Sequence, residues 1–315
     1  MMAIGLAVIG LGKIAQDQHL PAIAASRDFD LVCGASLQGD CPAGTTYRSV
    51  EEMLASEPGI EAVSLCQPPQ ARFAAARAAL LAGKHVLLEK PPGATLSEVA
   101  LLHDLAVERG LTLFTAWHSR EAPAVGPARA WLEGKRILSA AIVWREDVRV
   151  WHPGQRWIWQ AGGLGVFDPG INALSIATHI LPPFLLSGGT LSYPANQQAP
   201  IAADLSFLMV DGAPLTADLD FRQTGPQTWD IRIETDRGQL LLSRGGAEMA
   251  IDGVPQPLPP EAEYRGLYAR FAALIGAGGQ DVDRRPLRHV ADAFLRAERI
   301  EVEAFHDEPA VPAMA

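Results

Sequence analysis

The sequence has few cysteines and no long apolar run. Its three cysteines, Cys33, Cys41 and Cys66, are odd in number, and their spacing matches neither a metal site nor a disulfide framework. We therefore expect buried, free thiols in a reducing compartment. No apolar stretch reaches the ~18 residues of a membrane span. The apolar N-terminus has no basic residues before it, which argues against a signal peptide. These absences predict a cytoplasmic protein.

Basic residues are also scarce. The 26 Lys and Arg residues are outnumbered by 36 Asp and Glu residues, which leaves a formal net charge of −10. Nucleic acids and anionic membranes require a basic face, so neither is expected as a partner. The acidic residues and histidines show no three-ligand spacing, so no metal site is predicted. The 315 residues, 48% of them hydrophobic, suffice for about two globular domains.

Residues 1–117 alternate short apolar strands with helical segments. Helices are predicted to begin at the capping boxes Ser49–Glu52 and Thr95–Glu98, and another is predicted over 71–82. The β-α-β order predicts a doubly wound α/β domain with a parallel sheet. The predicted strands are 5–10, 31–35, 62–66, 85–89 and 111–115.

The pattern changes after Trp117. Alternating segments such as 217–221 and 229–233 predict a largely antiparallel, open sheet, so residues 118–315 are predicted to form a second, α+β domain. The tail after His306 is expected to be disordered. The other predicted elements are a strand over 139–148 and helices over 123–132, 170–180, 262–275 and 288–302.

A glycine motif, G-L-G-K-I-A at residues 10–15, follows the first strand and opens a helix. Gly10 permits a tight turn, and Gly12 lets the backbone approach a pyrophosphate at the helix N-terminus. Ala15 stands where many such motifs have a third glycine. A glycine-rich turn without a ligand is the alternative, but the position after a strand favours binding. We therefore predict a dinucleotide-binding Rossmann domain, with Lys13 and Ile14 as further contacts.

The second predicted strand ends without the carboxylate that usually accepts a hydrogen bond from the ribose 2′-hydroxyl of NAD. No acid occurs before Asp40, and Ser36 could donate to a 2′-phosphate, but no arginine stands beside it in the sequence. Both NADP and NAD remain open as cofactors, with NADP slightly favoured. The remaining predicted cofactor contacts, at the ends of the next two strands, are Gln67, Pro68, Glu89 and Lys90.

Lys90 follows the fourth predicted strand in the sequence Glu89-Lys90-Pro91-Pro92. Open α/β sheets bind ligands beyond the carboxyl ends of their strands. An ammonium there can hydrogen-bond a substrate hydroxyl or the cofactor ribose, or relay a proton if its pKa is lowered. The prolines restrict the loop. A solvated surface lysine is the alternative, but the position at the sheet end favours a catalytic role.

Asp168 and Asn172 are four residues apart and should share a helix face. Asp168 can cap the helix that follows it, and this structural role is as well supported as binding by the spacing alone. A carboxylate and an amide on one face also make a polyol-binding pair. Spacing therefore leaves a structural and a binding interpretation of these two residues.

Glu146 and His152 flank a stretch that is rich in tryptophan. Sugars stack their C–H faces on such rings and donate their hydroxyls to carboxylates, whereas a domain interface would use tryptophan equally well. His118, just after the last strand of the first domain, again lies at a sheet end. The other histidines are interpreted as structural. The tryptophans concerned are Trp151, Trp157, Trp159 and Trp229.

Together these motifs resemble the glucose–fructose oxidoreductase/myo-inositol dehydrogenase family. The glycine motif, Glu89-Lys90-Pro91, and Asp168 with a polar residue four positions later occur in the family's order. The segments 117–120, 146–147, 151–155 and 162–172 are similar to its bacterial L-arabinose and D-galactose 1-dehydrogenase branch. Many relatives have His where this chain has Asn172. An amide cannot act as a general base, so Asn172 would orient the sugar.

The resemblance implies NAD(P)-dependent oxidation of an aldose at C1 to the aldonolactone, by a homodimer or homotetramer built through the open sheet. Lys90 and Asp168 would be catalytic, and either could take the proton. Two alternatives remain: a sugar- or redox-sensing regulator without catalysis, and an oxidoreductase acting on a cyclitol or keto-sugar. The implied substrate contacts are His118, Glu146, Trp151, His152, Asn172 and Trp229.

Overall fold

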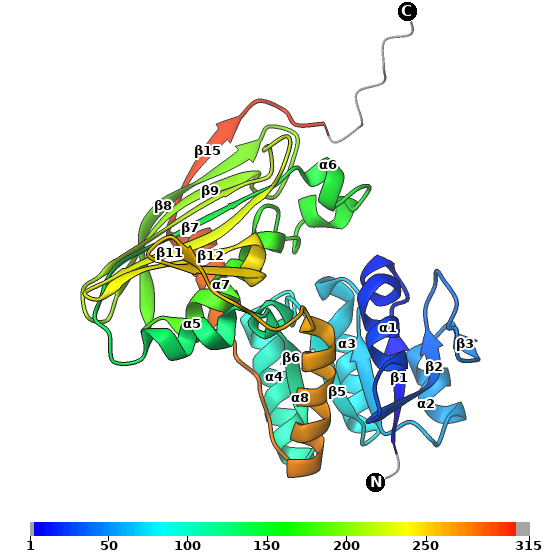
Figure 1. The fold of residues 1–315 in the computed structure, drawn as a ribbon. Coiled ribbons are helices and arrows are strands. Elements are labelled where there is room, and N and C mark those ends of the chain that lie inside the picture. The colour runs from blue at the N-terminus through cyan, green and yellow to red at the C-terminus, as the bar shows by residue number, and fades with distance from the viewer. Residues whose placement is uncertain (1–2, 307–315) are drawn as a thin grey trace, which may run out of the picture. The chain divides into compact units, whose positions relative to one another are not determined.

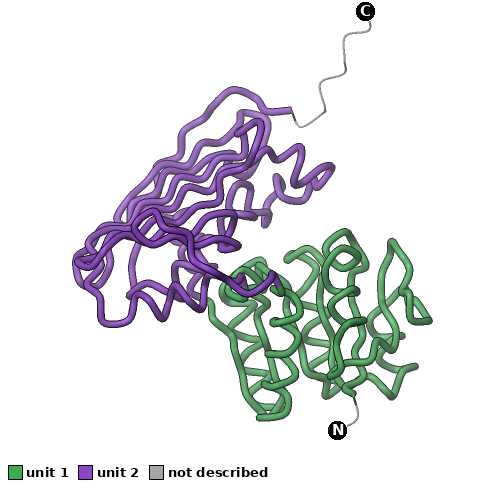
Figure 2. Tube along the Cα trace, in the orientation of Figure 1, with its two compact units in different colours: residues 1–121, 262–284 green, residues 122–261, 285–315 purple. Residues whose placement is uncertain are grey.

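A computed structural model describes residues 3–306, which form two compact units (Figures 1 and 2). Among these residues, unit 1 holds 3–121 and 262–284, and unit 2 holds 122–261 and 285–306. The sequence had placed all of 118–315 in one domain. Helix α8 (Glu263–Ala277) instead belongs to unit 1, because its buried aromatic side chains join the apolar core there. The predicted disordered tail lies outside the described residues.

Unit 1 is built on a six-stranded parallel sheet in the order β3-β2-β1-β4-β5-β6. This order reverses between β1 and β4, as in a doubly wound sheet, and confirms the predicted Rossmann fold. Alternate residues of β1 enter two separate cores, so both faces are covered. The strands are β1 (Ile4–Ile9), β2 (Phe29–Ala35), β3 (Thr46–Tyr47), β4 (Ala62–Leu65), β5 (His85–Glu89) and β6 (Leu113–Ala116).

The helices of unit 1 begin and end where local chemistry predicts. Ser49 accepts from the N–H of Glu52, and Thr95 and Glu98 form the predicted capping box. Gly110 ends the latter helix in the left-handed conformation. Besides α8, the helical segments are η1 (Ala15–His19), α1 (Leu20–Ala24), α2 (Val50–Ser56), α3 (Pro69–Leu81), α4 (Leu96–Arg109) and η2 (His118–Glu121).

Unit 2 is built on a nine-stranded sheet in the order β14-β13-β12-β11-β7-β10-β9-β8-β15. The pairs β7–β10 and β8–β15 are parallel and the other pairs antiparallel, which confirms a largely antiparallel sheet. The strands are β7 (Ile137–Arg145), β8 (Phe184–Pro194), β9 (Ala202–Met209), β10 (Pro214–Asp220), β11 (Thr228–Thr235), β12 (Gly238–Ser243), β13 (Glu248–Ile251), β14 (Val254–Pro255) and β15 (Glu298–Val302).

Helices pack against this sheet, and alternate side chains of β9 and of the first four residues of β8 are exposed. The helix predicted over 288–302 is partly wrong: it ends at Arg296, and residues 298–302 form β15, because they pair with the edge strand β8. The helical segments are α5 (Val125–Leu132), α6 (Val148–Trp151), η3 (Arg156–Trp159), α7 (Phe167–Ile180), η4 (Arg244–Gly246) and α9 (Arg285–Arg296).

The described residues hold neither a membrane-spanning helix nor a metal-binding cluster. None of the helices between residues 3 and 306 is both long and apolar enough to cross a membrane. Within the same range, no three His, Cys, Asp or Glu side chains come together in a way that could hold a metal ion.

Candidate active-site residues

The glycine turn after β1 has the geometry that a dinucleotide needs. Gly10 has φ +89°, and a Cβ there would lie 2.8 Å from the N atom of Gln67, so only glycine fits. A Cβ on Gly12 would meet nothing within 4 Å, so the backbone is open on that side. Ala15 is fully buried in the core, where its methyl group replaces the third glycine.

The surroundings of this turn fit a dinucleotide. The side-chain oxygen Oε1 of Gln67 is buried and has no hydrogen-bond partner among the described residues, so a bound ligand can satisfy it. Lys13 is exposed and pairs with Asp17, Ile14 is half-buried, and Pro68 is exposed after β4. These residues would hold the diphosphate and ribose of a nicotinamide dinucleotide at the carboxyl ends of the strands.

Lys90 lies directly after β5 and is half-buried, with a cis peptide bond to the buried Pro91. A buried arginine that the sequence analysis missed holds this strand end. Arg72, on α3 and only 2% exposed, donates to the carbonyl oxygens of Gln67, Glu89 and Pro91. It thereby ties the end of β4 to the loop that carries Lys90. Its place on the alanine-rich, buried face of α3 was the available signal.

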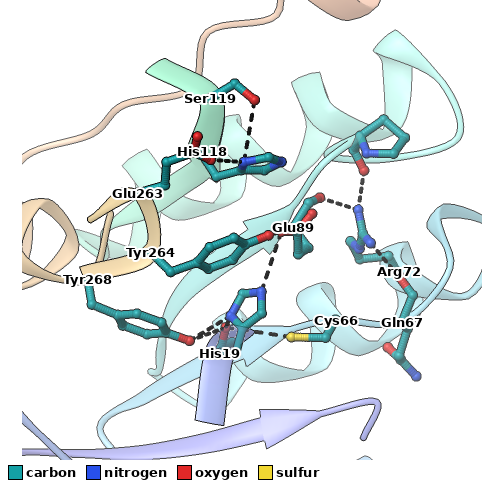
Figure 3. Close-up of polar contacts among 12 residues, drawn as sticks. His19, Cys66, Gln67, Arg72, Glu89, His118, Ser119, Glu263, Tyr264 and Tyr268 are labelled. Atoms are coloured by element: carbon teal, nitrogen blue, oxygen red, sulfur yellow. Dashed lines mark hydrogen bonds and ion pairs between the residues drawn. The ribbon is translucent and has the colours of Figure 1, made fainter. Parts of the chain in front are cut away.

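The carboxylate of Glu89 points into the interior rather than toward solvent (Figure 3). It is 2% exposed, accepts from the Tyr264 hydroxyl at 2.8 Å, and lies 3.4 Å from His19 Nε2. On the other side of the ring, His19 Nδ1 lies 2.7 Å from the Tyr268 hydroxyl oxygen. The buried position of this carboxylate favours a structural role at the end of β5, directly before Lys90. A cofactor contact by Glu89 stays a prediction.

The charges in this network stabilise each other. Burial by itself would raise the pKa of Glu89, but the hydrogen bond and charge of His19, with smaller effects from His118 and Lys90, lower it to about 2. Burial by itself would lower the pKa of His19, but Cys66, Tyr268 and Glu89 together raise it well above 6.5. Glu89 and His19 are therefore a buried ion pair at neutral pH.

His118 begins η2 at the end of β6, as predicted. Its Nδ1 lies 2.7 Å from Glu263 Oε2, and its ring stacks on Tyr264 with centroids 5.2 Å apart (Figure 3). Sequence reasoning missed Glu263, Tyr264 and Tyr268, because they follow β6 by about 150 residues and their helical spacing indicates only a packed face. Helix α8 is therefore a component of the strand-end region in unit 1.

Asp168 does not cap its helix, and that structural interpretation is wrong. Helix α7 begins at Phe167, and its first flanking residue, Val166, makes no side-chain cap. The helix begins early because Gly165, at φ +54°, turns the chain and Val166 N donates to the carbonyl of Pro200. Asp168 therefore lies in the first turn, 3% exposed, where the partial positive charge of the helix end favours a carboxylate. Asn172 is half-buried one turn later.

The structure joins three of the predicted substrate contacts of unit 2 to Asp168. His152 Nε2 lies 3.0 Å from Glu146 Oε1, and His152 Nδ1 lies 3.5 Å from Asp168 Oδ2. Trp229 Nε1 donates to Glu146 Oε2 at 2.9 Å. One imidazole thus stands between two buried carboxylates. Such an arrangement can accept a proton at one side and release it at the other.

Four tryptophans of unit 2, Trp144, Trp151, Trp159 and Trp229, lie in two environments. Trp229 stacks on the buried Trp144, with ring centroids 5.9 Å apart. Trp151 tilts against Trp229, with ring centroids 4.7 Å apart. Trp151 is 40% exposed and can offer a ring face to a sugar. Trp159 is buried and packs edge-on against Phe221, so it serves the core. Residues predicted for the cofactor, with Lys90 and His118, thus lie in unit 1, and the other predicted substrate contacts lie with Asp168 in unit 2.

Two dehydrogenases and a reductase are similar to this chain over nearly its whole length. Over 98% of its length the chain is 45% identical to the whole of a galactose 1-dehydrogenase of Pseudomonas fluorescens. It is 58% identical to a D-galactose-1-dehydrogenase from Rhizobium etli of known structure, with a TM-score of 0.94 over 97% of this chain and 99% of that one. A 3-ketoreductase from Actinomadura kijaniata, solved with TDP-benzene and NADP, shares the fold at 20% identity and a TM-score of 0.81, over 95% and 99% of the two chains.

The family follows from these matches and from the sequence of the first unit. Residues 4–117 match the family described as "Oxidoreductase family, NAD-binding Rossmann fold". The match covers the region of the glycine motif and of Glu89-Lys90-Pro91, on which the resemblance was based. The chain therefore belongs to the GFO/IDH/MocA family of NAD-binding oxidoreductases.

Proposed function

We propose that this protein oxidises an aldose, D-galactose or the related L-arabinose, at C1 to the aldonolactone with NADP or NAD. The observation that carries the proposal is the placement of the His152 ring between the carboxylates of Glu146 and Asp168 in unit 2. It occurs in a chain that is similar over nearly its whole length to two proteins named galactose 1-dehydrogenases. L-Arabinose differs from D-galactose by one hydroxymethyl group and is retained for that reason.

Each residue of unit 2 has a defined task in this proposal. The Asp168 carboxylate takes the proton of the C1 hydroxyl, and His152 can pass it toward Glu146. Asn172, one turn along α7, orients a ring hydroxyl. Trp151, with Trp229 behind it, supplies an aromatic surface for the sugar's C–H face. Glu146, whose carboxylate has lone pairs beyond those that face His152 and Trp229, also accepts from a ring hydroxyl.

Unit 1 would hold the cofactor and assist at the reacting hydroxyl. When bound, the nicotinamide dinucleotide supplies the hydride acceptor. The turn at Gly10 and Gly12 receives its diphosphate. Lys90 donates a hydrogen bond to the C1 hydroxyl and stabilises its negative charge as the proton leaves. His118 lines the sugar's binding site.

The proposal extends to assembly. Leu185 and Leu208, which pair across β8 and β9, and Val210, just after β9, are 58%, 46% and 77% exposed. Contiguous apolar side chains on a sheet favour contact with a second copy. We propose a cytoplasmic homodimer or homotetramer formed through the sheet of unit 2. Light scattering after gel filtration measures the mass, and a monomer at micromolar concentration would contradict it.

Steady-state kinetics test the activity. The purified protein is given D-galactose, L-arabinose, D-glucose and D-xylose with each nicotinamide cofactor, and reduction is followed by absorbance. We expect turnover with D-galactose or L-arabinose and weaker turnover with the other two sugars. The absence of turnover with every aldose would contradict the proposal. If a stable protein partner were then found, the sensing alternative would replace it.

A further inference from the structure

The strand register brings a basic residue to the end of β2 that the sequence does not place there. β3 pairs with β2 in parallel, with Thr46 opposite Gly34 and Tyr47 opposite Ala35. The next residues on the two strands are Arg48 and Ser36. Arg48 Nη1 donates to the carbonyl oxygens of Ser36 and Leu37, each at 3.1 Å. An arginine thus stands where a Rossmann domain distinguishes the two nicotinamide cofactors.

Ser36, the residue that the sequence suggested for a 2′-phosphate, is already occupied. Its hydroxyl donates to the carbonyl of Gln38 and accepts from the N–H groups of Leu11 and Gln38, at 3.2 and 3.1 Å. These bonds tie the turn after β2 to the glycine turn after β1. The Ser36 hydroxyl has one hydrogen, and that hydrogen is engaged within the turn. A phosphate at this place needs another donor.

Arg48 can supply that donor. A guanidinium has five N–H groups, and both hydrogen bonds to the turn come from Nη1. The Nε and Nη2 groups can therefore face a ligand while Nη1 holds the side chain in place. The side chain is exposed, and no carboxylate in residues 3–306 forms an ion pair with it. A planar guanidinium that is held through Nη1 can bind a phosphate bidentately through Nε and Nη2.

We propose that Arg48 binds the 2′-phosphate of NADP and makes the protein prefer NADP over NAD. The inference rests on the dinucleotide site of the proposed function, but not on the sugar or on Asp168. The turn carries no carboxylate before Asp40 that would accept from a ribose 2′-hydroxyl or repel the phosphate. The preference therefore comes from an attraction that NAD cannot gain.

Calorimetric titration with two cofactor fragments tests this without catalysis. Adenosine 2′,5′-bisphosphate carries the 2′-phosphate and 5′-AMP lacks it. Arg48→Gln should weaken the binding of the bisphosphate by about 10- to 100-fold, which is the range expected for the loss of one charge-assisted hydrogen bond. The same substitution should change the affinity for 5′-AMP by less than about twofold. Arg48→Lys keeps the charge and loses the planar guanidinium, so its affinity for the bisphosphate should lie between those of the wild type and Arg48→Gln.

Arg27→Gln is the matched control. Arg27 is exposed just before β2, at the opposite end of the same strand, and its substitution changes the net charge equally. It should leave the affinity for both fragments unchanged.

Three results would overturn the proposal. If Arg48→Gln weakens the binding of both fragments equally, Arg48 only stabilises the turn after β2. If it weakens neither, the 2′-phosphate lies elsewhere. If the wild-type protein binds neither fragment, the dinucleotide site itself is wrong. By contrast, loss of the bisphosphate preference in Arg48→Gln would support the role of Arg48 even if no sugar were oxidised.

Discussion

Each unit holds a histidine beside a carboxylate that is at most 2% exposed, and these two histidines, His19 and His152, differ in their surroundings. The His19 side chain is 0% exposed and lies among Glu89, Tyr268 and Ser64, all in the interior of unit 1. The His152 side chain is 14% exposed and lies between Glu146 and Asp168. A sealed imidazole beside one carboxylate forms a fixed ion pair, whereas a partly open one between two carboxylates can exchange a proton. In the proposed function, similar residue types thus serve stability in unit 1 and proton transfer in unit 2.

The largest effect is expected in unit 2. Asp168→Asn keeps the size of the side chain and removes its basicity, so kcat should fall by about 10²- to 10⁴-fold. The unfolding free energy should fall by only about 0.3–1 kcal/mol, because an amide still fits the first turn of α7 but loses the attraction of a carboxylate to the helix end. Asp211→Asn, on an exposed turn, is the control and should leave kcat unchanged. Loss of kcat in the control, or its retention in Asp168→Asn, would remove Asp168 from the mechanism.

In unit 1 the largest effect should be on stability. Glu89→Gln leaves His19 without its counter-ion, and breaking a buried pair costs about 3 kcal/mol of unfolding free energy at pH 7. The folded pKa of Glu89, about 2, lies below its usual 4.5, so its contribution is complete above pH 4.5. It is lost as the pH falls toward 2, and the difference from the wild type should shrink there.

Urea unfolding at pH 7 and at acid pH measures this effect. Glu108→Gln, at an exposed position of α4, is the control and should match the wild type at both pH values. A difference between wild type and Glu89→Gln that grows as the pH is lowered would contradict the ion pair. The contribution of His19 depends on pH in the opposite direction. Because its pKa is raised in the folded protein, it stabilises the fold at low pH, and this contribution is lost as the pH rises through the folded pKa.

A smaller effect is expected at Tyr264. Tyr264→Phe removes the hydroxyl that donates to Glu89 Oε1 at 2.8 Å and keeps the ring that stacks on His118. The unfolding free energy should fall by about 1 kcal/mol, the usual value of one hydrogen bond. Tyr47→Phe, whose half-buried hydroxyl donates to Glu57, offers a matched hydroxyl deletion that should cost less. Equal losses in the two variants would mean that the buried carboxylate gains nothing special from Tyr264.

Much of the fold could be predicted from local sequence. The strands of unit 1 are short apolar runs between turn residues, and Thr95 and Glu98 announce a helix by a reciprocal cap. Residues 298–302 were mistaken for helix, because nothing in E-R-I-E-V outweighs a preceding helical pattern. Their conformation is decided by the edge of β8, which lies more than 100 residues earlier in the chain.

The candidate site residues also differ in how far the sequence alone could indicate them. Asp168 and Lys90 could be chosen because each lies where an element begins or ends. Arg48 could not, because β3 has only two residues and leaves no periodic signal, yet its pairing with β2 delivers the side chain to Ser36. The packing of α8 on unit 1, which brings Tyr264 to Glu89, depends on contacts between residues 175 positions apart.

The central claim is that Lys90 and Asp168 act on the C1 hydroxyl of an aldose. The most direct measurement is the kinetics of D-galactose oxidation by the wild type and by Lys90→Ala, with the product identified by mass spectrometry. We expect the aldonolactone as the wild-type product and a fall in kcat of at least about 100-fold in Lys90→Ala. A variant that kept the wild-type kcat and raised only KM, or a wild type that formed no lactone, would contradict the account.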